Sequence, residues 1–125
     1  MYPCLICLGS NYNREQNLSL ARGRLVELFP TIRFARVEET ASLCVSNPDA
    51  FLNQLALFRT SRSAEEVADR LKEIEQRAGR KPEDKQQERI CLDVDLLVYG
   101  GEILKPEDMQ YAHVRRGIKE LSFKL

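Results

Sequence analysis

The hexapeptide Leu92-Asp93-Val94-Asp95-Leu96-Leu97 places two carboxylates inside a run of strand-forming aliphatic residues. Because a strand sends successive side chains to opposite faces, Asp93 and Asp95 are predicted to share one face and the alternating aliphatic residues the other. Side chains two residues apart on one face lie ~6.5–7 Å apart. This arrangement suits Mg²⁺, which prefers one or two carboxylates together with substrate phosphates. The alternative is a solvated strand face, but aspartate is depleted in strands, which favours the metal site.

Length and charge restrict the class of protein. The chain has 125 residues, enough for one domain with a hydrophobic core and too few for two, so we predict a single domain over residues 1–125. Its 19 basic and 19 acidic residues balance, which predicts neither a nucleic-acid partner nor an anionic membrane surface. With no apolar run near the ~20 residues of a membrane span and no signal-peptide pattern at the start, a cytoplasmic protein is expected.

The four cysteines do not form a convincing metal or redox motif. Cys4 and Cys7 make a CxxC, but it lies inside the strand-like run 4–8, where residues three apart point to opposite faces. Cys44 and Cys91 supply no second pair with matching spacing. All four are therefore predicted to be small, mostly buried apolar residues.

The first half of the chain predicts a strand, a helix and two further strands. Residues 4–8 read as a buried strand ended by a polar turn at 9–11, and Asn13 with Gln16 forms a capping-box pattern at the start of a helix that ends before Pro30. Residues 31–38 read as a half-exposed strand, and residues 51–59 as the next one after a loop.

The second half predicts a helix, a long loop and a strand. Ser63 and Glu66 form a clear capping box, and the apolar stripe that follows ends at Gly79. Residues 80–88 are polar and without periodicity, as in a functional or mobile loop, and the strand with the two aspartates runs over residues 90–99. The order β-α-β-β-α-β is typical of an α+β, ferredoxin-like fold in which two main helices back one antiparallel sheet.

Four short motifs occur in a characteristic order. They are Gly9-Ser10-Asn11 after the first strand, Phe51-Leu52-Asn53 in the third, Ile74-Glu75 with Gly79-Arg80 at the end of the second helix, and Leu92-Asp93-Val94-Asp95. With this order and spacing, residues 4 to about 118 resemble the 6-hydroxymethyl-7,8-dihydropterin pyrophosphokinases, enzymes of folate synthesis. The resemblance implies transfer of the β,γ-diphosphoryl unit of ATP to the hydroxymethyl oxygen of a reduced pterin, with release of AMP.

The resemblance also implies a cofactor and partners. Two Mg²⁺ ions held by Asp93 and Asp95 would bridge phosphate oxygens and the attacking hydroxyl. ATP and the reduced pterin would be the partners of a protein that we expect to be a monomer. Protein groups contribute mainly positioning and charge neutralisation to such transfers.

The nucleotide side of the site would consist of cationic residues that suit phosphate oxygens, namely Arg80, Arg89, His113 and Arg116. Arg80 would act with the two aspartates in catalysis. Three of these residues have an alternative: Arg80 could interact only with the helix C-terminus, His113 could be a surface residue, and Arg116 could belong to a solvated basic face.

The pterin side would consist of Asn53, Phe51 and Asn11. The Asn53 amide offers both a donor and an acceptor to the polar edge of the pterin, and Phe51 could stack on the ring. Asn53 could instead bond only backbone, and Asn11 could simply fix the turn after the first strand.

The chain departs from the family pattern in the loop before the aspartates. Gln87 stands where the family has a tryptophan, and Ile90 stands where it has an arginine, with Arg89 displaced by one residue. Ile118 replaces a ring-stacking phenylalanine. Two alternatives therefore remain: a relative that binds nucleotide on the same fold without pterin turnover, and a generic ferredoxin-like binding module.

Overall fold

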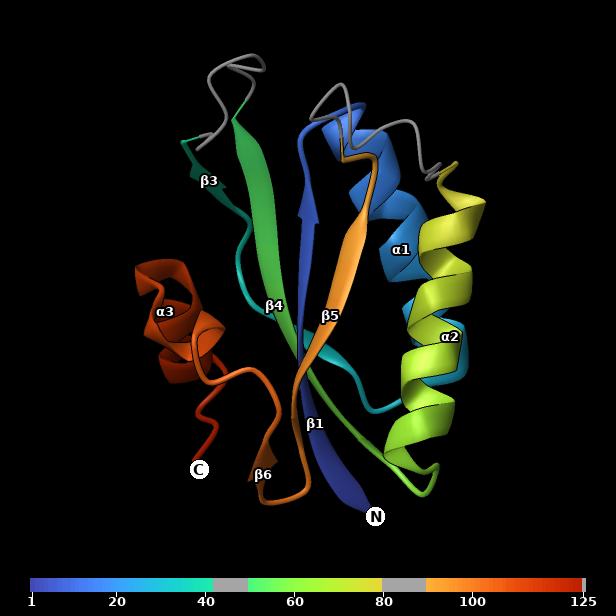
Figure 1. The fold of residues 1–125 in the computed structure, drawn as a ribbon, viewed down its shortest axis with the longest axis vertical. Helices are drawn as coiled ribbons and strands as arrows, with labels where there is room; N and C mark the ends of the chain where they lie inside the picture. The colour runs from blue at the N-terminus through green and yellow to red at the C-terminus, as the bar shows by residue number, and fades with distance from the viewer. Residues whose placement is uncertain (42–49, 80–89, 125) are drawn as a thin grey trace.

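A single antiparallel sheet lies between helices in the computed structural model, which describes residues 1–41, 50–79 and 90–124. Figure 1 shows α1 and α2 on one side of the sheet and α3 on the other. In chain order the elements are β1 (Tyr2–Ser10), α1 (Arg14–Leu28), β2 (Arg33–Phe34), β3 (Glu38–Thr40), β4 (Phe51–Thr60), α2 (Ala64–Arg77), β5 (Asp93–Tyr99), β6 (Glu102–Ile103), a 3₁₀ turn (Asp108–Gln110) and α3 (Ala112–Glu120).

The strand order confirms the predicted ferredoxin-like α+β fold. The sheet runs β2-β4-β1-β5-β6, with β3 also paired to β4. β1 is therefore central, and both of its neighbours, β4 and β5, pair with it in antiparallel register. This register sets Cys7 opposite Asp95 and Gly9 opposite both Asn53 and Asp93, so residues from three strands meet at one end of the sheet.

The face of the sheet under α1 and α2 carries the larger core. Alternate residues of β1 and β5 point into it, as the strand pattern predicts, and Phe58 of β4 stacks on Phe29 just after α1 with ring centroids 4.0 Å apart. The buried members of this cluster are Cys4, Ile6, Leu8, Leu18, Ala21, Leu25, Phe29, Ala56, Phe58, Val67, Leu71, Ile74, Leu92, Val94 and Leu96. None of the helices described is both long and apolar enough to cross a lipid bilayer.

The opposite face is covered by α3, which sequence patterning did not predict. The basic segment at residues 113–116 lies inside this helix, and its apolar side packs on a smaller cluster that includes Leu5, Leu55 and Val114. A methyl group added at Gly117 would lie only 2.6 Å from Cγ of Leu55. The glycine therefore allows α3 to approach β4 closely.

The strand predicted at residues 31–38 is divided into β2 and β3. Between them the Gln54 side chain donates to the Ala35 carbonyl at 2.8 Å, and the Arg36 amide donates to the Glu120 carboxylate of α3. Side chains thus take over hydrogen bonds that a continuous strand would make with its neighbour. The undivided-strand prediction was wrong because these partners lie far away in the sequence.

Two helix starts were predicted with different success. The Ser63 cap is confirmed: its hydroxyl accepts a hydrogen bond from the Glu66 amide at 3.1 Å. Asn13, by contrast, precedes α1 in a left-handed conformation (φ 45°), and its side chain makes no capping hydrogen bond. The predicted Asn13 cap is therefore wrong, because its geometry departs from the extended backbone that places a capping side chain over the first turn.

The cysteines have the predicted character where they are described. Cys4 and Cys91 are buried, and Cys4 faces the α1/α2 core whereas Cys7 faces the other side. Cys44 lies outside the described residues.

Candidate active site

Three carboxylates meet at the edge of β5. Asp93 and Asp95 project from one face of β5, Glu75 comes from the last turns of α2, and one oxygen of each lies within 4.8 Å of the others. Val94 and Leu96 alternate with the two aspartates along β5 and point into the core, which confirms the predicted alternation. The sequence predicted only the two aspartates as metal ligands, although the Ile74-Glu75 motif had already placed a glutamate before them.

Glu75 has a second contact that fixes its position. Its Oε2 accepts a hydrogen bond from the Val94 amide at 2.8 Å. Among the described strands, β6 pairs with β5 only at Val98 and Tyr99, so the beginning of β5 is a sheet edge. The glutamate therefore satisfies an edge amide and keeps its carboxylate beside the two aspartates.

The chemistry of this carboxylate cluster fits a hard divalent cation. Three half-buried carboxylates close together repel one another, and a cation relieves that repulsion. Oxygen ligands of this kind suit Mg²⁺, which keeps some coordination positions for water and substrate phosphates. The residues present can therefore hold the metal that the sequence predicts.

Lys105 adds a positive charge to the cluster. Its Nζ lies 3.1 Å from Oδ1 of Asp95. Burial disfavours the charged ammonium, but the hydrogen bond to Asp95, with the charges of Asp95, Asp108 and Asp93, outweighs it and raises the pKa of Lys105. The lysine therefore stays charged and offsets part of the local negative charge. Sequence patterns near Asp95 did not predict this contact, because Lys105 lies beyond the turn between β5 and β6.

A cavity of about 460 Å³ lies beside the cluster on the α3 side of the sheet. Five residues predicted from sequence line it together: Asp93, Asp95, Phe51, Asn53 and His113. The Asn53 side chain is held in place, because its amide nitrogen donates to the Thr40 hydroxyl at 2.7 Å. The structure thus gathers residues from β3, β4, β5 and α3 around one hollow, which we call the central cavity.

Cys7 lines the central cavity as a neutral thiol. Burial, followed by the negative charges of Asp95, Asp108 and Asp93, raises the pKa of Cys7 to about 12. A nucleophilic cysteine needs a lowered pKa. This residue therefore packs in the cavity wall and has no role as a nucleophile at neutral pH.

His113 stands between the central cavity and a second one. Its ring stacks on Tyr111 with centroids 5.7 Å apart, and burial lowers its pKa below the usual 6.5 despite the nearby Glu38 carboxylate, which acts in the opposite direction. The imidazole is therefore neutral at pH 7, with one nitrogen available as a donor and the other as an acceptor.

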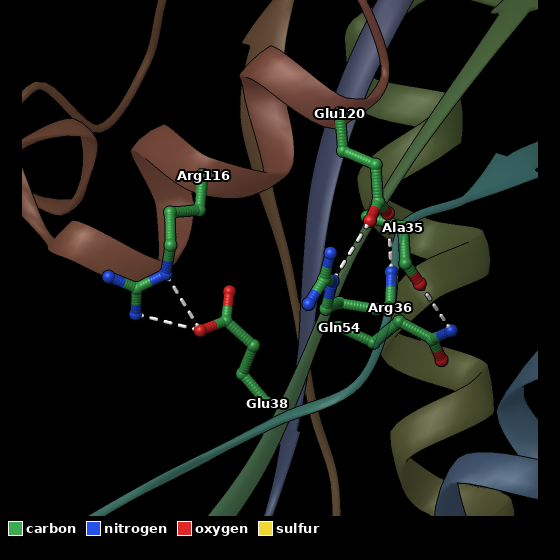
Figure 2. Close-up of polar contacts among 6 residues, drawn as sticks. All are labelled: Ala35, Arg36, Glu38, Gln54, Arg116 and Glu120. Atoms are coloured by element: carbon green, nitrogen blue, oxygen red, sulfur yellow. Dashed lines mark hydrogen bonds and ion pairs between the residues drawn. The ribbon is translucent and has the colours of Figure 1, made fainter.

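The second cavity, of about 420 Å³, lies between α3 and the β2–β3 region and shares Asn53 and His113 with the central cavity. Arg116 lines it and forms an ion pair with Glu38, with 2.7 Å between Nη2 and Oε1. Figure 2 shows the two side chains pointing toward one another from α3 and from the strand segment that carries Glu38. The Arg116 hydrogen bond is the main cause of the lowered pKa of Glu38.

A third hollow, of about 460 Å³, runs along the edge of β5 beside α2, and we call it the edge groove. Ala68, Leu96 and Leu104 give it apolar walls, and Glu75, Asp95 and Lys105 give it charge. Asp95 lines both the edge groove and the central cavity. The carboxylate cluster therefore lies between two hollows, each large enough for a small ligand.

Three predicted site residues remain, namely Asn11, Arg80 and Arg89. Asn11 is buried, its Oδ1 accepts from the Ile90 amide at 2.6 Å, and its own amide donates to the Ile90 carbonyl at 2.9 Å. It thus anchors the approach to β5, and it is not among the residues that line the central cavity. Arg80 and Arg89, and the loop predicted around them, lie outside the described residues.

Comparisons with known proteins bear on the whole of this region. The family model of 7,8-dihydro-6-hydroxymethylpterin-pyrophosphokinase (HPPK) matches residues 5–122, a range that includes the carboxylate cluster and the lining of all three hollows. None of the curated proteins matches the chain. The solution structure of the C-terminal domain of the MgtC protein from Mycobacterium tuberculosis is similar at a TM-score of 0.43 and 8% sequence identity, over 77% of this chain and 87% of that chain.

Proposed function

Because this chain belongs to the 7,8-dihydro-6-hydroxymethylpterin-pyrophosphokinase family, we propose that it is a Mg²⁺-dependent enzyme that transfers diphosphate from ATP to 6-hydroxymethyl-7,8-dihydropterin. In this reaction the hydroxymethyl oxygen bonds to the β-phosphorus and loses its proton, and the bond between that phosphorus and the oxygen of AMP breaks. The observation that carries the proposal is the carboxylate cluster, which lies between two hollows within the matched range.

We assign one substrate to each hollow. Two substrates that react at the carboxylate cluster must approach it from different sides, and Asp95 lines both the central cavity and the edge groove. The central cavity holds Phe51 and Asn53, which suit a flat heterocycle with a polar edge, so we place the pterin there. The edge groove, with apolar walls and Lys105, suits the base of ATP, and its phosphates would extend from there past the carboxylate cluster toward His113 and Arg116.

Asp93, Asp95 and Glu75 hold the metal in this proposal. Bound Mg²⁺ would supply charge neutralisation for the phosphate oxygens. The protein's contribution is rigidity: Asp93 and Asp95 are fixed by the ladder between β1 and β5, and Glu75 by its bond to the Val94 amide. Fixed carboxylates support the alignment of the two substrates, which is the main source of acceleration in phosphoryl transfer.

Asn53 and Phe51 orient the pterin. The hydrogen bond from Asn53 to Thr40 restrains the amide, so it can present its carbonyl oxygen to donors on the heterocycle. Phe51, at the wall of the same cavity, can pack on the ring face. Together they would direct the hydroxymethyl group toward the carboxylate cluster.

His113 and Arg116 serve the phosphates in this proposal. The neutral His113 can donate one hydrogen bond, and the Arg116 guanidinium can offer two parallel ones. Arg80 and Arg89 remain predicted phosphate ligands from the sequence alone.

The decisive experiment is an assay of AMP formation from MgATP and 6-hydroxymethyl-7,8-dihydropterin. We expect AMP and the pterin diphosphate in equal amounts, with the reaction lost when Mg²⁺ is chelated. Formation of ADP would contradict diphosphate transfer. Nucleotide binding by calorimetry without any AMP would instead indicate a relative that binds nucleotide on this fold without turnover.

A further inference from the structure

Glu38 occupies the guanidinium of Arg116 through one hydrogen bond and a second close ion-pair contact. Its Oε1 accepts from Nε at 2.8 Å and lies 2.7 Å from Nη2 (Figure 2). Arginine binds carboxylate and phosphate oxygens through the same guanidinium N–H groups. The carboxylate therefore stands where a phosphate oxygen bound to Arg116 would stand.

The two partners differ in their access to solvent. The Arg116 side chain is 61% exposed, whereas that of Glu38 is only 21% exposed, inside the second cavity. An incoming anion can thus reach the guanidinium from the solvent side. Because exposed ion pairs contribute little to stability, the pair can be exchanged for a more highly charged partner at small cost.

Glu38 stays ionised in this environment. The hydrogen bond from Arg116 keeps its pKa below the usual value, and the burial of the carboxyl group acts in the opposite direction with less effect. Its negative charge therefore persists at neutral pH and opposes any phosphate that approaches Arg116.

We propose that Glu38 sets the nucleotide affinity of this chain by competing with the phosphates for Arg116. The inference rests on the proposed function, because it takes Arg116 as a phosphate ligand. In the empty protein Glu38 holds the guanidinium, and binding of the triphosphate displaces the carboxylate from it. Removing the charge of Glu38 should therefore tighten binding.

The test is calorimetric titration with the Mg²⁺ complex of α,β-methylene-ATP, at low ionic strength. We expect Glu38→Gln to bind about two- to five-fold more tightly than the wild type, which is the range of one exposed ion pair. The gain should shrink in high salt, because salt screens the repulsion that the substitution removes. Arg116→Ala should weaken binding, and adding Glu38→Gln to it should then give a smaller gain, because only the charge repulsion and not the competition for Arg116 is left to remove.

Glu39→Gln is the matched control. Glu39 is the next residue of the same strand and pairs with Arg14 at 2.9 Å, so the substitution removes the same charge and a comparable ion pair away from Arg116. We expect its affinity to stay within about 1.5-fold of the wild type, well inside the range of surface effects.

Three results would overturn the inference while leaving the proposed function intact. Weaker nucleotide binding by Glu38→Gln would mean that Glu38 positions Arg116. An equal gain in affinity from Glu39→Gln, or an equal gain from Glu38→Gln in the Arg116→Ala background, would mean that competition for Arg116 is not the cause. Absence of nucleotide binding in both the wild type and Glu38→Gln would overturn the two proposals together. Thermal unfolding of each variant confirms that the proteins compared are folded.

Discussion

The two faces of the sheet are covered to different extents. On one face, α1 and α2, with 15 and 14 residues, bury a continuous apolar core. On the other, the 9-residue α3 covers a smaller cluster and leaves the central cavity and the second cavity beside it. We infer that the first face supplies most of the stability and the second most of the chemistry.

One strand serves both faces. In β5, Val94 and Leu96 belong to the larger core, whereas Asp93 and Asp95 face the central cavity. Because neighbouring residues point to opposite sides, substitutions a single position apart should affect different properties. The division between the faces can therefore be tested by comparing unfolding with turnover.

The largest effect is expected from Phe58→Ala on the face of the sheet that α1 and α2 cover, which we call the closed face. Phe58 is 1% exposed and stacks on Phe29, so truncation leaves a cavity in the core. Loss of a buried phenylalanine typically lowers the free energy of unfolding by about 3–5 kcal/mol. Denaturant unfolding measures the loss, and turnover per folded molecule should change little. A fall below about 1 kcal/mol would show that this face does not carry the stability.

Asp93→Asn should give the opposite result. It removes one charge of the carboxylate cluster, so we expect turnover to fall at least 100-fold, about 2.7 kcal/mol in activation free energy. The free energy of unfolding should stay the same or rise slightly, because repulsion among carboxylates decreases. Asp108→Asn is the control, since Asp108 lines the central cavity but is not among the three clustered carboxylates. Equal losses of turnover in the two variants would contradict the metal assignment.

The features predicted from sequence depend on neighbours close along the chain. The alternation of β5 and the cap formed by Ser63 and Glu66 follow from local geometry, and the structure shows both. The alternation also locates the aspartates, and the apolar stripe that ends at Gly79 locates the end of α2, so the family motifs could be recognised from the sequence. Periodic segments with local hydrogen bonds are the part of a fold that pattern reasoning recovers best.

The features that were missed depend on contacts across the chain. Helix α3 packs through Gly117 against Leu55, and the division of β2 from β3 depends on a carboxylate of α3. The contact between Lys105 and Asp95 likewise crosses the turn after β5. The sequence around these residues does not predict their partners, because only the tertiary fold brings the two together.

Gly117→Ala should have a moderate effect on stability through the face that α3 covers, which we call the open face. The added methyl group would lie 2.6 Å from Cγ of Leu55, so α3 or the leucine must shift. Overpacking of this kind costs about 1–3 kcal/mol in the free energy of unfolding. We expect turnover to fall as well, since α3 carries His113 and Arg116.

Gly23→Ala is the matched control for this substitution. Gly23 lies within α1, and a methyl group there meets no atom of the described residues within 4 Å, so the change should stabilise the helix by about 0.5–1 kcal/mol. Thermal unfolding distinguishes the two directions. Stabilisation by both substitutions would mean that α3 is not held closely against β4.

The smallest effect concerns the only histidine, His113 on the open face. Burial lowers its pKa below 6.5, so the unfolded chain takes up the proton more readily than the folded one. Its contribution to stability is therefore complete above pH 6.5 and is lost as the pH falls through that value toward the folded pKa. Arg116 acts in the same direction as burial, whereas Glu38 and Asp108 oppose both.

Because the ring is only half-buried, solvent screening keeps this contribution below about 1 kcal/mol. We expect the wild type to lose more stability between pH 7 and pH 5 than His113→Gln, as measured by denaturant unfolding at each pH. The carboxyl groups are the same in both proteins, so the difference between the two slopes reports the imidazole together with its charge interaction with Glu38. Parallel slopes would mean that His113 is as well solvated in the folded protein as in the unfolded chain. The open face would then contribute nothing to the pH dependence of stability through this residue.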